Sequence, residues 1–395
     1  MSRGAQRAGR RARRFLLVAA PFAAHLVPLV SIGRELAARG HAVAWVAYPP
    51  LASLLPGDAT WFPGPAEAAA RTIAERGRRR PPRFGAAEVV WFYSDIVAPL
   101  VDVMTADVEA AVARFAPDVV VADQHALAGA FVARLRGLPW ATSAPTSLAQ
   151  IEPADEHPAV RRWLGAWYAD VQRAAGMAPL VDTPDLSPSL VLLYTSRLLA
   201  GAHRVFPPAF RFVGPALAHR VEPADFPWAA LADRPRVLVS LGSIVAEDAR
   251  RFFSALVAAL RDEPVQVVVS APEGALAGAP ANFLVRPWLP QVALMPHVHA
   301  VVSHGGSTAL DALAFDRPLV LAPVWTDNFV TAQRIVDAGA GLRVRYGRIG
   351  PERLREAVRA VLTEPEYRAH AAEVGTSLRA AGGTVAAADL VAALA

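Results

Sequence analysis

Short runs of apolar residues alternate with amphipathic helical patterns along most of the chain, and this alternation constrains the fold more than any other feature. Runs at residues 15–20, 118–122 and 300–303 are rich in Val, Leu and Ala. Helical spacing of apolar residues follows the first two runs, at 28–39 and 127–136. Unbroken apolar runs of this length are typical of strands buried on both faces of a parallel sheet. The pattern predicts an α/β protein built from parallel sheets and covering helices.

The alternation stops at residues 214–234, a Pro- and Ala-rich stretch without clear periodicity, and then restarts. We predict one domain over 15–213, a linker over 214–234, a second domain over 235–380 and a C-terminal helix over 381–395. Residues 1–14 carry six Arg and no acidic residue, so removing them changes the net charge from +5 to −1. This segment is expected to be a disordered leader on a nearly neutral body.

The chain contains no Cys and no Lys, and its 40 basic residues are all Arg. Thiolate chemistry, cysteine metal sites and lysine-dependent phosphate loops are therefore excluded. Outside the leader, a dense Arg cluster stands beside two prolines near 76–83, which predicts a solvated loop rather than a nucleic-acid surface. The sequence contains no Asp-x-Asp pair of the kind that holds a metal–diphosphate complex, so no metal site is expected.

Arg13 and Arg14 precede an apolar run, an arrangement that is shared with secretory signal peptides. Pro21, His25 and Pro28 interrupt the apolar stretch, and an amphipathic helix follows, so a buried first strand is the better interpretation. No other stretch reaches the roughly 18 apolar residues of a membrane span. We expect a cytoplasmic monomer or homodimer.

A short segment after the run at 300–303 carries the densest cluster of candidate binding groups. His304, Gly305 and Gly306 follow the run, and Ser307 and Thr308 stand where the next helix begins. Free backbone N–H groups and the positive end of the helix dipole meet at such a position, and glycine allows a ligand to approach closely. The segment predicts a phosphate or diphosphate site; a glycine-rich turn capped by Ser is the alternative.

A second candidate site combines His25, between the first strand and the first helix, with Asp123 at the end of the run at 118–122. In a doubly wound sheet both would lie at the carboxyl edge, where ligands bind. Asp123 would fix the tautomer by accepting from one imidazole nitrogen, and the other nitrogen could take a hydroxyl proton. A structural histidine, Asp123 as a helix N-cap, and His125 as a competing base stay open at this point.

Five sequence elements, in order, resemble the signature of the UDP-glycosyltransferase family. They are 21–28 (PFAAHLVP), 212–215 (FVGP), 239–243 (VSLGS), 286–291 (RPWLPQ) and 301–335, which contains SHGGSTALDAL and RPLVLAP. Together they cover most of the chain. The resemblance implies two facing Rossmann-like domains, the B-type glycosyltransferase fold. It also implies that the second domain holds a nucleotide sugar and the first holds an acceptor.

The resemblance assigns a role to each matching residue. It implies a catalytic base, His25, supported by Asp123. Diphosphate binding is implied for His304, Gly305, Gly306, Ser307, Thr308 and Ser243. Binding of the base and ribose is implied for Trp288, Gln291 and Asp311, and binding of the sugar for Asp327 and Asn328. The co-substrate is a nucleoside diphosphate sugar, and neither a metal nor another cofactor is implied.

Three departures from the family pattern concern the donor site. The segment from His304 to Pro318 is one residue shorter than usual, Asp311 stands where Glu is common, and Asn328 replaces the usual Gln. They predict that the nucleotide site is kept and the sugar-facing end is reshaped. An unusual sugar is one consequence, and loss of activity is another.

The family resemblance implies an inverting transferase that moves a sugar from UDP or dTDP to a hydroxyl of a small natural product. Aromatic residues at 91–93 and 163–168 could line an acceptor pocket, although such spacing is more typical of a core. A nucleotide-sugar epimerase and a non-catalytic homologue that binds a nucleotide sugar or a partner protein are the alternatives. Acceptor-dependent release of nucleoside diphosphate distinguishes the three.

Overall fold

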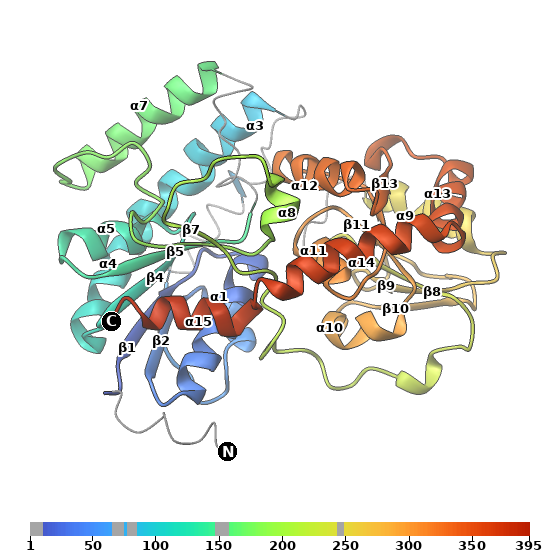
Figure 1. Ribbon diagram of the computed structural model, residues 1–395, viewed down its shortest axis with the longest axis horizontal. Helices are drawn as coiled ribbons and strands as arrows, with labels where there is room; N and C mark the ends of the chain where they lie inside the picture. The colour runs from blue at the N-terminus through green and yellow to red at the C-terminus, as the bar shows by residue number, and fades with distance from the viewer. Residues whose placement is uncertain (1–10, 65–74, 77–84, 147–157, 243–248) are drawn as a thin grey trace.

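A computed structural model describes residues 11–64, 75–76, 85–146, 158–242 and 249–395, and it contains two parallel β-sheets with helices around each (Figure 1). Successive residues of the first strand face different cores. Leu16 and Val18 pack in one apolar cluster, while Phe15 and Leu17 pack in the cluster on the other side of the sheet. Burial on both faces explains why the strand is an unbroken apolar run. The predicted α/β class is confirmed.

The first sheet has seven strands in the order β3-β2-β1-β4-β5-β6-β7. Their bounds are β1 Arg14–Val18, β2 Ala42–Ala47, β3 Thr60–Pro63, β4 Val119–Asp123, β5 Trp140–Ala144, β6 Val191–Leu193 and β7 Phe210–Phe212. The helices of this half are α1 Ala23–Ala38, α3 Ala86–Trp91, α4 Ala98–Phe115, α5 Leu127–Leu135, α7 Pro158–Ala174 and α8 Arg197–Gly201, and a π-helical turn, η2 Phe92–Val97, joins α3 to α4.

The second sheet has six strands in the order β10-β9-β8-β11-β12-β13. Their bounds are β8 Arg236–Ser240, β9 Gln266–Ser270, β10 Phe283–Arg286, β11 Ala300–Ser303, β12 Leu319–Leu321 and β13 Gly341–Arg343. The helices are α9 Ala249–Leu260, α10 Gln291–Leu294, α11 Ser307–Ala314, α12 Thr326–Asp337, α13 Pro351–Thr363 and α14 Pro365–Ala380. Short 3-10 turns lie at η1 Pro49–Leu54, η4 Trp228–Ala230, η5 Met295–His297 and η6 Tyr346–Arg348.

The last helix, α15 Gly383–Ala392, returns from the second half and lies along α1 (Figure 1). Ala387, Ala388 and Val391 are buried in the apolar cluster of the first sheet. Arg39 at the end of α1 donates to Asp389 at 2.6 Å. The two halves are thus joined twice, by the segment between β7 and β8 and by the crossing into α15.

The described elements differ from the sequence expectations in a few places. The first strand begins at Arg14, inside the segment expected to be a disordered leader, because the Arg14 guanidinium donates to the Phe115 carbonyl oxygen at 2.6 Å and stacks over the Phe115 ring. Residues 1–10 of that segment lie outside the described residues. Strands β3, β5 and β13 leave no apolar run that would predict them, because their sequences are short or carry polar residues.

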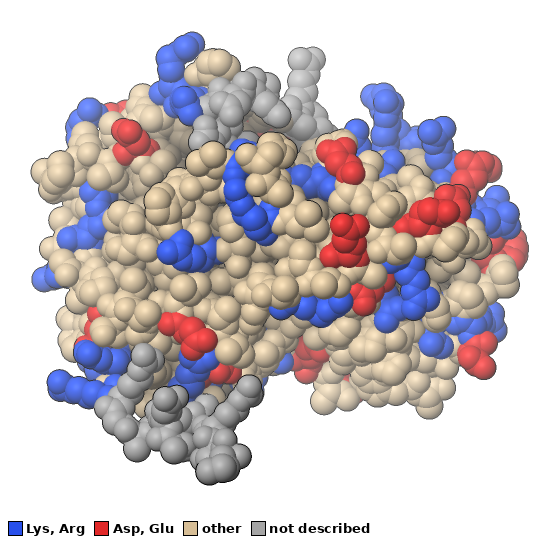
Figure 2. Space-filling model, in the orientation of Figure 1, with Lys and Arg blue, Asp and Glu red and all other residues tan. Residues whose placement is uncertain are grey.

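On the face shown in Figure 2, arginine and acidic side chains are interspersed over the second half of the molecule rather than gathered into one basic band. Of the helices in the described part of the chain, none combines the length and the apolar character that a membrane span requires.

Candidate active site

Each sheet has one place where the strand order reverses, and the candidate groups lie at these two places. In the first sheet the reversal falls between β1 and β4, and in the second between β8 and β11. His25 belongs to the first turn of α1, after β1, and Asp123 is the last residue of β4. His304 directly follows β11. Open α/β sheets bind ligands beyond the carboxyl ends of their strands at such a reversal.

His25 and Asp123 form a buried hydrogen-bonded pair. The His25 Nδ1 to Asp123 Oδ2 distance is 2.8 Å, and the residues are 7% and 1% exposed. The second oxygen of Asp123 accepts from the backbone N–H of His125 at 2.9 Å. A carboxylate only accepts, so Nδ1 carries the proton and Nε2 keeps its lone pair. The arrangement is that of a general base held by a carboxylate.

His125, the competing base, lies 5.0 Å from the His25 ring, centroid to centroid, and packs edge-on against Phe92. Among the described residues neither of its ring nitrogens has a hydrogen-bond partner. Burial, followed by the nearby His25, lowers the pKa of His125 to about 3. A ring that resists protonation so strongly is a poor proton acceptor, which argues against His125 as the base.

Within the described residues, His25, Asp123 and His125 form one group of potential metal ligands, with one ligand atom from each lying within 4.8 Å of the others. The Nδ1 atom of His25 is already engaged with Asp123, and His125 contacts aromatic rings. We interpret this group as a site that takes up and releases a proton.

The first turn of α11 supplies the candidate diphosphate site. Gly306 precedes the helix without a side-chain cap, and Ser307 is exposed, so no capping side chain occupies the first N–H groups of the helix. His304 lies beneath the turn, and burial lowers its pKa to about 4. A neutral His304 can still donate one N–H to an anion. Ser243 lies outside the described residues.

Two positions in this turn require glycine, one because of its backbone conformation and the other because of a close contact. Gly305 has φ +94°, in the left-handed region that glycine tolerates. A Cβ at position 306 would lie 2.5 Å from Nε2 of His304. The Gly-Gly pair therefore lets the backbone turn tightly above the imidazole and present its N–H groups.

A cavity between the two halves lies directly over this turn. It is lined from the first half by Tyr194 and Thr195, among others, and from the second by Gly305, Gly306, Ser307, Asp327 and Arg334. Burial raises the pKa of Asp327 to about 6, with His25 opposing the rise and Glu88 adding to it. Asp327, on the second half, and His25, on the first, therefore interact electrostatically across the boundary. Trp91 stacks on Trp325 across the same boundary, with ring centroids 6.3 Å apart.

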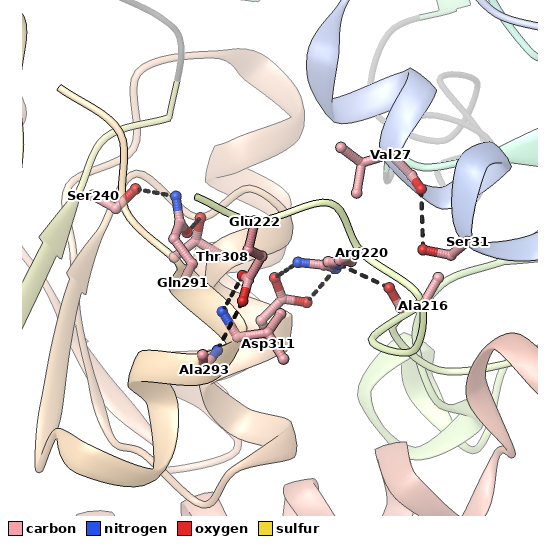
Figure 3. Close-up of polar contacts among 11 residues, drawn as sticks. Val27, Ser31, Ala216, Arg220, Glu222, Ser240, Gln291, Ala293, Thr308 and Asp311 are labelled. Atoms are coloured by element: carbon pink, nitrogen blue, oxygen red, sulfur yellow. Dashed lines mark hydrogen bonds and ion pairs between the residues drawn. The ribbon is translucent and has the colours of Figure 1, made fainter. Parts of the chain in front are cut away.

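The residues predicted to bind the base and ribose lie in the loop before α10, at the start of α10 and in α11. Trp288 follows β10 in a loop and is 51% exposed, which excludes the alternative that it is a core aromatic. Gln291 begins α10, where its side chain accepts from Thr308 at 2.9 Å and donates to Ser240 at 3.2 Å (Figure 3). Asp311 lies one turn beyond Ser307 and is 1% exposed.

Asn328 has a local structural role. Its Oδ1 accepts from the backbone N–H of Trp325 at 3.2 Å, and its Nδ2 donates to Asp327 at 3.3 Å. The side chain thus caps α12 and orients Asp327. A direct contact of Asn328 with the sugar stays a prediction.

Several side chains near the site were not predicted from the sequence, because no periodicity or motif marks them. Arg220 and Glu222 lie between the two sheets, and both bind the second half beside Asp311 and Gln291 (Figure 3). Arg334, late in α12, lines the cavity, and Glu88, in the first turn of α3, interacts electrostatically with Asp327. These two acids and two arginines carried no local motif that could identify them.

The aromatic residues at 91–93 and 163–168 were expected either to line an acceptor pocket or to form a core. They do not all have the same role. Tyr93 and Tyr168 are buried core residues of the first half. Phe92 is partly buried and contacts Phe22 and His125, so it lies beside the base. Phe22 also contacts His25, with ring centroids 5.2 Å apart, so aromatic rings pack beside His25.

Two Rossmann-like sheets, a carboxylate-held histidine at one reversal point and a glycine-rich helix terminus at the other together define a B-type glycosyltransferase. Solved structures agree. The glycotransferase of kitacinnamycin superposes with a TM-score of 0.78 over 98% of this chain and 100% of that one, at 26% identity. The calicheamicin glycosyltransferase CalG4 gives a TM-score of 0.73 over 98% of each chain, at 25% identity.

Residues 254–388 match the family model described as Erythromycin biosynthesis protein CIII-like, C-terminal domain. The 4'-demethylrebeccamycin synthase of Lentzea aerocolonigenes is 31% identical over 96% of this chain and 98% of its own length. The demethyllactenocin mycarosyltransferase of Streptomyces fradiae is 31% identical over 94% of this chain and 84% of its own. The chain belongs to the UDP-glycosyltransferase family, and within it to the natural-product glycosyltransferases.

Proposed function

We propose that the protein transfers a sugar from a nucleoside diphosphate to a hydroxyl of a small natural product, with inversion at the anomeric carbon. One observation carries the proposal: His25, held by Asp123 at 2.8 Å, interacts electrostatically with Asp327 of the opposite half, and Asp327 lines a cavity together with the first turn of α11. A single displacement needs a base on the acceptor side of the anomeric carbon and an anion site on the side of the leaving group.

In the proposed reaction the acceptor hydroxyl lies between His25 and the anomeric carbon. Nε2 of His25 takes the hydroxyl proton while the oxygen forms its bond to that carbon. The bond between the carbon and the phosphate oxygen breaks on the opposite side, so the configuration inverts. Asp123 stabilises the imidazolium that forms. General-base assistance of this kind contributes roughly 10²–10⁴ to a rate.

The departing diphosphate gains negative charge as the bond breaks, and it would lie beside the first turn of α11. Backbone N–H groups after Gly306, the helix dipole and the N–H of a neutral His304 would stabilise it. These groups supply the electrophilic assistance, so we expect transfer to continue with a metal chelator present. The Ser307 and Thr308 hydroxyls lie in the same turn.

The nucleoside would lie along α11 from this turn. One helical turn covers about 5.4 Å, which brings a ribose from the diphosphate to the level of Asp311. The exposed Trp288 ring offers a stacking surface for the base beyond it. Asp327, lining the cavity next to the diphosphate site, would accept from sugar hydroxyls.

The family relatives support the acceptor class. Both relatives at 31% identity are named for natural-product glycosylation, one as a rebeccamycin-type synthase and one as a mycarosyltransferase. The aromatic rings beside His25, including Phe92 and Phe22, suit a planar or apolar aglycone.

The test combines the purified protein with a panel of UDP- and dTDP-sugars and aglycones and follows the products by mass spectrometry. We expect glycoside formation and release of nucleoside diphosphate that depend on the acceptor. Interconversion of sugars without an acceptor would indicate an epimerase instead. Nucleotide binding without either reaction would indicate a non-catalytic homologue.

A further inference from the structure

His125 is buried beside the proposed base, and its ring nitrogens have no hydrogen-bond partner among the described residues. The residue is only 1% exposed, so water does not take the place of a partner. The rings of Phe92 and Tyr93 pack against the imidazole in edge-to-face arrangements, with centroids 4.8 and 6.4 Å away, and neither supplies a polar group there. Two unsatisfied nitrogens are uncommon in a protein interior and indicate a bound water, a bound ion or a chemical role.

The unsatisfied nitrogens of His125 belong to a compact group with His25 and Asp123. One potential ligand atom from each of the three residues lies within 4.8 Å of the other two. The Asp123 carboxylate contacts both histidines, since it accepts from Nδ1 of His25 at 2.8 Å and from the backbone N–H of His125 at 2.9 Å. His25 is in the first turn of α1, Asp123 ends β4 and His125 lies in the turn that follows, so the first sheet holds the group together.

Two imidazoles and one carboxylate are a ligand set that suits zinc. Zinc binds such ligands at about 2.0–2.2 Å, and sites with two histidines and one carboxylate leave a fourth position open. A tetrahedral ion with these bonds holds its ligand atoms about 3.4 Å apart, so separations of up to 4.8 Å can close by small side-chain rotations. His25 is 7% exposed, which lets a small ion reach the group from solvent. Magnesium requires an octahedron of oxygen ligands and does not fit.

We propose that His25, Asp123 and His125 form a zinc-binding site, and that an ion bound there inhibits sugar transfer by occupying the base. A neutral imidazole has one lone pair and one N–H. Zinc at Nε2 of His25 uses the lone pair that would take the acceptor proton, whereas zinc at Nδ1 leaves the ring proton on Nε2. In both cases His25 cannot accept a proton. The zinc site needs neither donor nor acceptor, and only its inhibitory effect rests on the proposed function.

Calorimetric titration of the full chain with zinc chloride tests the site without any substrate. We expect one tight site per chain and an affinity about 100-fold lower in His125→Phe, because removing a group that only supports a zinc ligand already costs about 10–100-fold. Phe keeps a ring in the same place and removes both nitrogens. His297→Phe is the matched control, since His297 is an exposed histidine of the second half that contacts Trp228, and this variant should bind zinc as the wild type does.

Two further measurements follow the same ion. Cobalt(II) replaces zinc in tetrahedral sites and absorbs visible light far more strongly there than in an octahedral site, so the wild-type chain should show strong bands that zinc suppresses, whether or not the His125 variant folds. In the transfer assay, zinc at ten times its wild-type dissociation constant should slow the wild type about 10-fold and His125→Phe by only about a tenth, by mass action. EDTA should restore the wild-type rate, and magnesium at the same concentration should change nothing.

Equal zinc affinity of the wild type and folded His125→Phe overturns the inference, and so does a wild-type chain that binds no zinc or gives only weak cobalt bands. Inhibition by zinc that persists unchanged in His125→Phe also contradicts it, because the ion would then act elsewhere. If zinc binds as expected but no donor and acceptor react, the site is supported and the proposed function fails. Transfer by a chain that binds no zinc leaves the proposed function intact and removes only the site.

Discussion

Asp123→Asn is the substitution that most directly tests the proposed chemistry, because it changes one oxygen and keeps the shape of a side chain that is 1% exposed. The amide oxygen can still accept from the backbone N–H of His125, as Oδ1 does now. The amide nitrogen then faces Nδ1 of His25 and can only donate. His25 must carry its proton on Nε2, the atom that should receive the acceptor proton, so the base is blocked.

The expected size of the loss follows from the charge. Two unit charges about 4 Å apart attract by about 4 kcal/mol at an effective dielectric constant of about 20. That stabilisation of the imidazolium is absent in the Asn variant, and about 4 kcal/mol corresponds to roughly a 10³-fold slower transfer. The estimate lies within the range that general-base assistance contributes.

The assay is the initial rate of acceptor glycosylation with the donor and acceptor pair that the wild type uses. Nucleoside diphosphate affinity, which depends on the other half of the molecule, should be unchanged. Nitrogen-15 shifts of His25 should show the proton on Nδ1 in wild type and on Nε2 in the variant. Asp185→Asn is the matched control, since Asp185 is a buried carboxyl of the same half whose pKa burial raises to about 6. A variant with more than a tenth of wild-type activity, or with the proton still on Nδ1, refutes the reasoning.

Three further predictions concern the same site. Gly306→Ala places a Cβ 2.5 Å from Nε2 of His304, so nucleoside diphosphate affinity should fall about 10-fold or more by calorimetry, while Gly57→Ala, where a Cβ meets nothing within 4 Å, should change nothing. Asp327, with its pKa raised to about 6, keeps a proton between pH 4 and 6 that the unfolded chain has lost. Its contribution to stability therefore falls as the pH rises to 6, and Asp327→Asn should raise the free energy of unfolding more at pH 8 than at pH 4 in urea titrations. His125→Phe removes two buried nitrogens that lack partners among the described residues, so the free energy of unfolding should stay equal or rise by about 1 kcal/mol, with transfer kept within a few-fold; a large loss of transfer would instead make His125 the base.

The sequence predicted those elements whose burial leaves a periodic signal. The run at 300–303 coincides with β11, since a strand buried on both faces must be apolar throughout. Strand β5 is buried as well but contains Thr142 and Ser143, which are satisfied by the Asp185 carbonyl oxygen and the Tyr194 hydroxyl. These partners lie 43 and 51 residues away, so no local pattern could show that the strand is buried.

The site residues that were predicted carry a local sequence signal, and those that were not predicted depend on partners far away in the sequence. His25 and Asp123 were predicted because His25 follows the first strand and Asp123 ends another, and the residues that follow parallel strands meet at one edge of the sheet. Arg220 lies in a segment without periodicity and contacts Asp311, 91 residues away. Asp311 itself was expected to be open to a ribose, and only the three-dimensional structure shows that Arg220 covers it. Pairings formed across a domain boundary are set by how the halves dock, which the strand and helix pattern does not encode.

The position of the reacting groups on different halves makes the docking of those halves part of the chemistry. His25 belongs to the first half, and Asp327 and the first turn of α11 belong to the second. Each half is held rigid by its own sheet, so the distance between base and anomeric carbon depends on the contacts that join them. The Trp91–Trp325 stack closes one side of the boundary, and the 219–222 segment and α15 connect the halves elsewhere. Because bond formation tolerates little displacement, a substitution that loosens one of these contacts should slow transfer more than it weakens nucleotide binding.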